Sequence, residues 1–239
     1  MHILNTWLPF ASATITTVFA LLVLQRWGRK HHDHLLLWGI GLLMYAIGGT
    51  MEAIYGLGGW HPLVFRLWYL FGAVLVAAWL GQGTAYLLMR GKARRVAHAL
   101  MALLLIGSLY AAYKVFTAQL DPTQMISGEL SGHAIITPGV RVLTPFFNMS
   151  GVLLLVGGAT YSAWIFYRKR VLLNRVIGNI LIAVGALAPA VGGALQRAHV
   201  PLALYLGELL GAVLMFIGFL KATQAEPARA RVRQVEASA

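Results

Sequence analysis

The sequence predicts an all-α membrane bundle of seven transmembrane helices, for three reasons. Of its 239 residues, 59% are hydrophobic and only 11% are charged, whereas a soluble domain carries about 25% charged residues. The mean hydropathy is +0.73. The apolar residues fall into seven long segments, separated by short polar or Gly/Pro breaks. These features exclude disordered, collagen-like and coiled-coil chains, and also a nucleic-acid-binding module with a soluble core.

Each apolar segment is long enough for a helix to cross a hydrocarbon core about 30 Å thick, because a helix rises about 1.5 Å per residue. The predicted spans are 4–25, 35–57, 63–89, 96–116, 142–167, 176–195 and 201–220. No Lys or Arg precedes the first span, so we interpret it as a retained helix and not as a signal peptide. The spans form one transmembrane domain, residues 1–221. A basic tail follows, residues 222–239, which we expect to be disordered or to lie on anionic lipid.

The basic residues predict the orientation of the bundle. Fifteen of the 19 Lys and Arg residues follow the first, third, fifth and seventh spans. The positive-inside rule places those ends in the cytoplasm, so the N-terminus lies outside and the C-terminus inside. The four basic residues on the outer side are Arg66, Lys114, Arg141 and Arg197. The net charge of +12 therefore reflects topology and attraction to anionic lipid, and we expect no nucleic-acid partner. We expect a multi-pass protein of a bacterial-type cytoplasmic (plasma) membrane.

Two segments of the chain match at an offset of 139 residues. Residues 70–75 of the third span parallel residues 209–214 of the seventh, Pro62 parallels Pro201, and Gly39 parallels Gly178. The first three and the last three spans share one orientation, which leaves the fourth as an inverting linker. We therefore expect a 3+1+3 pseudo-repeat about an axis along the membrane normal. Both prolines are expected in the first turn of their helices.

In helix count and orientation this plan resembles the microbial rhodopsins, and it also looks like the sugar-transporting SWEET carriers. Rhodopsins hold retinal on a lysine in the middle of the seventh helix. Here the seventh span has only Lys221, at its cytoplasmic end, so we expect no retinal. The Pro-Gln pair typical of the SWEET group is absent. Residues 36–39, Glu52 and residues 66–70 are similar to the seven-helix sensor region of some bacterial histidine kinases, which implies a signalling role.

Two acidic residues, Glu52 and Glu208, lie inside predicted spans, roughly 7–11 Å below the outer helix ends. A charged group costs at least ~2.5–3.5 kcal/mol near the bilayer centre, so such residues are candidates for function. Other polar or small residues share a helix face with them or form similar stripes, and we expect these stripes to point inward. They are Tyr45, Gly48, Gly49 and Gly56; Tyr205, Ala212 and Met215; Arg66, Tyr69 and Ala73; and Arg141, Thr144 and Asn148.

We expect Glu52 to pair with Arg66 across a short turn, and Glu208 to pair with Arg141 or Arg197. One interpretation is that these pairs only hold helices together. The other is that polar side chains line an outward-open cavity for a ligand. The candidate ligand-binding residues are Glu52, Arg66, Tyr69, Arg141, Asn148, Tyr205 and Glu208.

Three outer histidines, His61, His133 and His199, suggest a weaker alternative, a metal-dependent membrane hydrolase with zinc at its outer face. Otherwise we expect no cofactor. The chain has no cysteine, catalytic triad, P-loop, dinucleotide fingerprint or EF-hand loop, so the sequence favours a non-enzyme and leaves an enzyme open.

The sequence thus favours a binding or sensor-like module for a small polar or amphipathic ligand, with a separate cytoplasmic or membrane protein as its partner. A small-solute carrier is the main alternative, because pseudo-repeats around a central site permit alternating access. The long outer loop 117–137 is either a lid or an ordinary linker.

Overall fold

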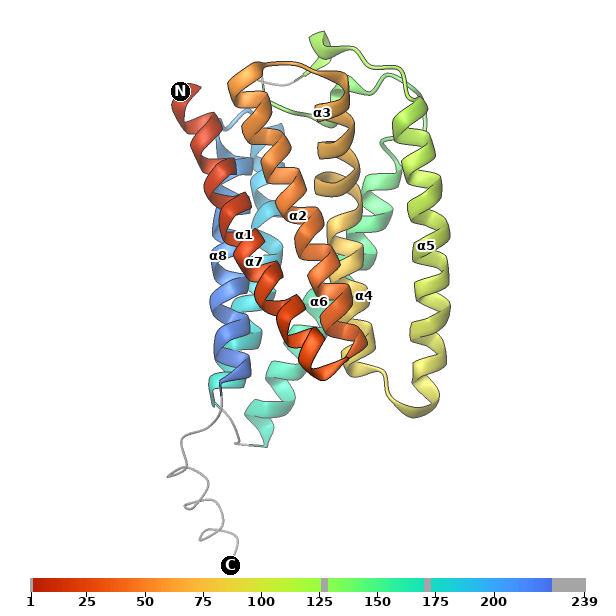
Figure 1. The fold of residues 1–239 in the computed structure, drawn as a ribbon, viewed down its shortest axis with the longest axis vertical. Coiled ribbons are helices and arrows are strands. Elements are labelled where there is room, and N and C mark those ends of the chain that lie inside the picture. Colours follow the sequence, from red (N-terminus) through yellow and green to blue (C-terminus); the bar gives the residue numbers. More distant parts are fainter. Residues whose placement is uncertain (1, 126–128, 170–172, 225–239) are drawn as a thin grey trace, which may run out of the picture.

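The computed structural model describes residues 2–125, 129–169 and 173–224. These residues form seven helical spans, long and apolar enough to cross a membrane, and no strand, which confirms the predicted all-α bundle (Figure 1). The elements are α1 (His2–Lys30), α2 (Asp33–Gly58), α3 (Pro62–Leu67) continued by η1 (Trp68–Leu75) and α4 (Val76–Leu88), α5 (Arg94–Thr117), α6 (Leu143–Arg168), α7 (Leu173–Arg197) and α8 (Ala203–Thr223). The predictions for Arg170 and for tail residues 225–239 lie outside the described residues.

The two repeat-related prolines begin their helices differently. Pro62 is the first residue of α3, and the ring Nδ1 of His61 accepts a hydrogen bond from the backbone N–H of Leu63 at 3.2 Å. Pro201 instead precedes its helix, because Leu202 adopts a left-handed conformation with φ of 62° and α8 begins only at Ala203. The expectation that both prolines lie in a first helical turn is therefore correct for Pro62 and wrong for Pro201.

Six of the seven spans form a closed ring, and α5 lies outside it. Around the ring α1 packs on α2, α2 on α4, α4 on α6, α6 on α7, α7 on α8, and α8 on α1. The helix α5 packs mainly on η1 and α4, and it stands apart from the ring on one side of the molecule (Figure 1). The position of α5 agrees with a 3+1+3 plan, in which the fourth span links two groups of three, and the pseudo-repeat itself stays a prediction.

Of the two glycine pairs matched by the predicted pseudo-repeat, one pair makes the same helix-to-helix contact in both halves and the other does not. In the third span, a Cβ at Gly72 would lie 3.2 Å from the Cα of Gly48 on α2. At the matching position of the last span, a Cβ at Gly211 would lie 2.7 Å from the carbonyl oxygen of Gly185 on α7. In each half, the third helix thus approaches the second at a glycine. The pair Gly39 and Gly178 does not follow this rule, since Gly39 faces α1 whereas Gly178 faces α8.

The third span contains an eight-residue π-helix, η1, that the sequence does not predict. A π-helix is wider than an α-helix, and such segments are rare and occur frequently at functional sites. The side-chain amide of Asn148 on α6 donates to the carbonyl oxygen of Ala73 inside this segment, at 3.1 Å. The segment also carries Trp68 and Tyr69, which are both buried.

The outer loop is a packed cover over the end of the bundle. Leu120 and Ile135 form a backbone bridge, and Leu130, Ala134 and Val140 are fully buried. A short 3₁₀ turn, η4 (Gly132–Ala134), lies against the ring of Tyr69, where a Cβ at Gly132 would come within 2.9 Å of the Tyr69 Cε2 atom. The loop is therefore more than a linker, because its own apolar side chains fill the space beside η1.

Candidate ligand-binding site

Glu52 is the centre of the candidate site. Its side chain is fully buried, and its Oε1 accepts a hydrogen bond from the indole Nε1 of Trp68 at 2.6 Å. Gly48, one turn earlier on α2, allows this contact because a Cβ there would lie only 2.8 Å from the backbone of Gly72. Within the part of the chain that the structure describes, Oε2 of Glu52 has no hydrogen-bond partner of ordinary geometry.

Glu208 brings a second carboxyl group to the same place. It lies half-buried on α8, close enough for its carboxyl group to interact with that of Glu52. Tyr45, two turns below Glu52 on α2, donates its hydroxyl to the backbone carbonyl oxygen of Glu208 at 2.8 Å. Tyr205, only 1% exposed, lies one turn from Glu208 and is within electrostatic range of both acids. The predicted residues Glu52, Tyr205 and Glu208 thus form one cluster.

No basic side chain accompanies this cluster among the described residues. The charged groups that act on Glu52 are the carboxyl groups of Glu208 and, less strongly, Glu129. The only ion pair in residues 2–125, 129–169 and 173–224 joins Arg94 to Asp33, at the opposite end of the bundle. The expected pairing of Glu208 with Arg141 or Arg197 is therefore wrong.

Arg66 is not the partner of Glu52. Its guanidinium group donates to three carbonyl oxygens at the end of α5: Nη1 to Val115 at 2.5 Å and to Phe116, and Nη2 to Ala118 at 3.0 Å. The last carbonyls of a helix have no partner within the helix and carry partial negative charge, so a guanidinium group is a natural cap for them. The predicted Glu52–Arg66 ion pair is wrong, because α5 offers Arg66 these acceptors instead.

The other predicted residues lie beside the cluster and not in it. The Tyr69 hydroxyl is 2.8 Å from the hydroxyl of Thr144 on α6, with Arg141 near enough to affect the Tyr69 ring hydroxyl electrostatically. Arg141 itself is exposed, and Asn148 is bonded to the π-helix. With Glu52, Tyr69 and Tyr205 all buried, these residues do not line an open cavity in this conformation. Their role in ligand binding stays a prediction.

Two residues of the site were missed at the level of sequence, Trp68 and Glu129. The buried carboxyl of Glu129, from the outer loop, accepts from the side-chain amide of Gln196 at 2.8 Å and from the backbone N–H of Leu202 at 3.0 Å. It thereby ties the loop to the turn between α7 and α8. The sequence offers one signal for each. Trp68 lies one helical turn before Gly72, a glycine of the matched segments, and Glu129 is one of only seven acidic residues. Either signal could have directed attention to them.

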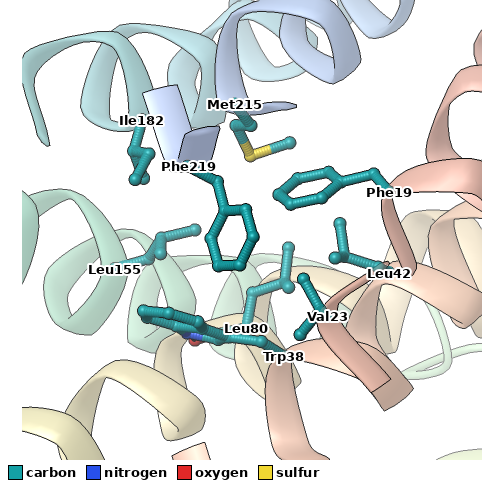
Figure 2. Close-up of a pocket in the computed structure, with 9 residues that line it drawn as sticks. All are labelled: Phe19, Val23, Trp38, Leu42, Leu80, Leu155, Ile182, Met215 and Phe219. Carbon is teal, nitrogen blue, oxygen red and sulfur yellow. The ribbon is translucent and has the colours of Figure 1, made fainter. Parts of the chain in front are cut away.

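Below the acidic cluster, the ring encloses an apolar chamber. It is narrow, with a cavity volume of about 30 Å³, and all six ring helices contribute to its wall (Figure 2). The lining residues are Phe19, Val23, Trp38, Leu42, Leu80, Leu155, Ile182, Met215 and Phe219. The Trp38 indole Nε1 donates to the carbonyl oxygen of Leu80 at 3.1 Å, so the polar atom of the lining is already bonded.

Two of the three outer histidines, His61 and His133, have local roles. His61 caps α3, and the ring of His133 lies 2.9 Å from the Ser131 hydroxyl. Among the described residues no three His, Cys, Asp or Glu side chains are grouped so as to hold a metal ion. The structure therefore lends no support to zinc chemistry at the outer face.

Comparison with models of protein families, with curated proteins and with solved structures finds no match to this chain.

Proposed function

We propose that this chain is a membrane-embedded binding or sensor-like module that holds a small amphipathic ligand between its helices, at the Glu52–Glu208 pair. The observation that carries the proposal is the buried Oε2 atom of Glu52, which lacks a hydrogen-bond partner among the described residues and lies near a second carboxyl group. Buried polar atoms are nearly always bonded, and an exception needs an explanation. A donor group on a ligand supplies the missing bond.

A purely structural role accounts for less of this arrangement. The Trp68 indole needs one acceptor oxygen, which a glutamine at position 52 would offer equally well. A second acid at position 208 adds repulsion when both carboxyl groups are charged. The contact between Tyr45 and α8 does not need an acid there, since it uses the backbone oxygen of Glu208. Acidic side chains in membrane helices are costly, and they typically mark binding sites or ion pathways.

A sensor also needs a route from the ligand to the cytoplasmic end, and α8 provides one. Met215 and Phe219 lie below Glu208 on this helix and line the apolar chamber (Figure 2). At the basic end, the Arg26 guanidinium carbon lies 4.7 Å from the centre of the Phe219 ring. A small shift of α8 on ligand binding thus alters the surface next to the basic end of α1, at Arg26, Arg29 and Lys30. A separate partner chain would bind at this surface.

Transport is less well supported than binding. A carrier needs a polar route through the cytoplasmic half, and Gln82 and Thr84 are its best candidates. The Gln82 amide donates to the carbonyl oxygen of Ala97 at 2.7 Å, and the Thr84 hydroxyl bonds to Leu80 and to Trp38. Both polar side chains are buried and already have partners.

Native mass spectrometry of the protein in lipid nanodiscs tests the proposal. We expect a stoichiometric small molecule on the wild type, and its loss in Glu52→Gln and Glu208→Gln. Asp33→Asn is the matched control, because Asp33 is an exposed acid at the other end of the bundle, and this variant should keep the molecule. A molecule retained equally by all four proteins contradicts the proposed site.

A further inference from the structure

The acidic pair and the apolar chamber lie on the same faces of two helices. On α2, Leu42 of the chamber precedes Tyr45 by one turn, and Glu52 lies two turns beyond Tyr45. On α8, Met215 follows Glu208 by two turns, which is about 10 Å along the helix. Tyr45 stands between the two regions through its bond to the Glu208 carbonyl oxygen. The polar pair and the chamber are therefore consecutive compartments along the axis of the bundle.

The groups of the polar compartment select for positive charge. They include two carboxyl groups, one with an unbonded oxygen, and the aromatic rings of Trp68, Tyr45 and Tyr205. An ammonium group has three N–H donors and no acceptor, so it matches carboxylate oxygens, and aromatic faces attract cations further. An anionic ligand would face two acids with no Lys or Arg to offset them among the described residues.

The chamber selects for hydrocarbon. Its wall consists of aliphatic side chains, Met215, the rings Phe19 and Phe219, and Trp38 with its indole N–H already bonded (Figure 2). A polar group placed there would find no partner, whereas an apolar chain gains about 25 cal/mol for each Å² removed from water.

We propose that the ligand is an amphipathic amine, whose ammonium group binds between Glu52 and Glu208 and whose hydrocarbon chain occupies the apolar chamber. This inference rests on the proposed function and adds the charge and shape of the ligand. Binding requires the Tyr45 ring to turn aside, because it stands between the two compartments. The side chains of the narrow chamber must also move apart to admit the hydrocarbon chain.

The test measures binding of three probes of equal chain length to the protein in nanodiscs: n-dodecylamine, n-dodecanol and n-dodecanoate. Empty nanodiscs give the background from the lipid. We expect saturable binding of the amine at least tenfold tighter than that of the alcohol, and no specific binding of the carboxylate. The Glu52→Gln/Glu208→Gln double variant should lose this tenfold preference.

Substitutions of residues that line the chamber test whether the hydrocarbon chain of the ligand lies there. Leu42→Phe and, independently, Met215→Phe reduce the space and should weaken dodecylamine binding at least fivefold. Leu103→Phe on the exposed side of α5 is the matched control and should bind as the wild type does. All variants are first compared with the wild type in thermal melting, and binding is read from those that melt normally.

The outcomes separate the inference from the proposed function. If the alcohol or the carboxylate binds as tightly as the amine, and binding still requires Glu52 and Glu208, the inferred positive charge of the ligand is wrong. The proposed binding site at these two residues is then still supported. The short amine n-butylamine is measured as a fourth probe. If it binds as tightly as dodecylamine, or neither chamber variant weakens dodecylamine binding, the proposed position of the ligand's hydrocarbon chain is wrong. If no probe binds above empty nanodiscs and no molecule co-purifies, both proposals fail.

Discussion

The indole Nε1 of Trp68 donates to the carboxyl Oε1 of Glu52 at 2.6 Å, and this bond joins the π-helical segment of the third span to α2. Its position follows from two glycines, Gly48 and Gly72, that let the backbones of the two helices come together one turn away from each partner. The contact satisfies one oxygen of Glu52 and leaves the other available. The same interaction therefore positions the carboxyl group and keeps it free to bind.

We predict that Glu52→Gln leaves the stability of the fold nearly unchanged. Glutamine keeps an acceptor oxygen for Trp68 and removes the repulsion from Glu208, and no basic residue loses a partner. Trp68→Phe should be clearly destabilising, by ~1–3 kcal/mol, because both oxygens of a buried carboxyl group are then unbonded. Thermal melting in nanodiscs provides the comparison.

The control for the tryptophan is Trp79→Phe. Trp79 is similarly buried, but its indole donates to the hydroxyl of Ser108 at 3.3 Å, a longer bond to an uncharged group. We expect a smaller loss of stability there. A fall in melting temperature for Glu52→Gln as large as that for Trp68→Phe would show that the negative charge of Glu52 is itself structural.

Arg66→Met should loosen the end of α5 without affecting Glu52. Removing three charge-assisted hydrogen bonds to the carbonyl oxygens of Val115, Phe116 and Ala118 should cost ~1.5–3 kcal/mol and speed amide hydrogen exchange near these residues. Arg141→Met is the control, because Arg141 is exposed, and it should leave exchange in α5 unchanged.

A double-mutant cycle on Glu52→Gln and Arg66→Met completes this test. Since the two residues share no partner, their effects should add within about 0.5 kcal/mol. A coupling energy well above that value would restore the ion pair that the sequence had suggested.

Hydrophobicity and helical spacing were sufficient to predict the spans and the inward direction of the polar stripes, but not that the two acids would lie together. Seven apolar segments identify seven helices, and the spacing of Gly48, Gly49 and Glu52 places one acid on an inward face of α2. These features depend on local periodicity, which the chain carries within each helix.

The partners of the charged groups depended on information that local patterns lack. The hydrogen-bond partners of Arg66 are carbonyl oxygens at the end of α5. Predicting them requires knowing how α5 packs against α3, which spacing within one helix does not reveal. The π-helix, which carries the buried residues Trp68 and Tyr69, was not predicted from helical periodicity. Glu129 reaches Gln196 across 67 positions of the chain, and periodicity within a single helix could not reveal this contact.

Gly48→Ala should separate α2 from η1. An added Cβ would lie 2.8 Å from the Cα of Gly72, a backbone atom that can move only with its helix, so we expect a loss of ~1–3 kcal/mol from overpacking. Gly157→Ala on α6 is the control, because no atom lies within 4 Å of a Cβ there. That change should be neutral or stabilising by up to ~1 kcal/mol, since alanine favours the helix. Equal melting temperatures for the two variants would contradict the close contact.

His133 should make the stability of the folded protein depend on pH. Burial lowers the pKa of His133 below its ordinary value of 6.5, and the positive charges of Arg141 and Arg197 lower it further. As the pH falls through 6.5, the unfolded chain therefore takes up a proton at this side chain before the folded chain does. Its contribution to stability is complete above pH 6.5 and is lost as the pH falls toward the pKa of the folded state.

Melting temperatures of the wild type and of His133→Asn, measured between pH 8 and pH 5, isolate this contribution. Asparagine removes the titrating group and retains a polar atom near the Ser131 hydroxyl, which lies 2.9 Å from the histidine ring. We expect the wild type to lose more stability than His133→Asn on acidification, with the difference developing below about pH 6.5. The other titrating groups, Glu52 and Glu208 included, are common to both proteins and cancel in the comparison. Parallel curves would mean that His133 has the same proton affinity in the folded and unfolded chains, and that the packing of the outer loop around it is looser than the structure indicates.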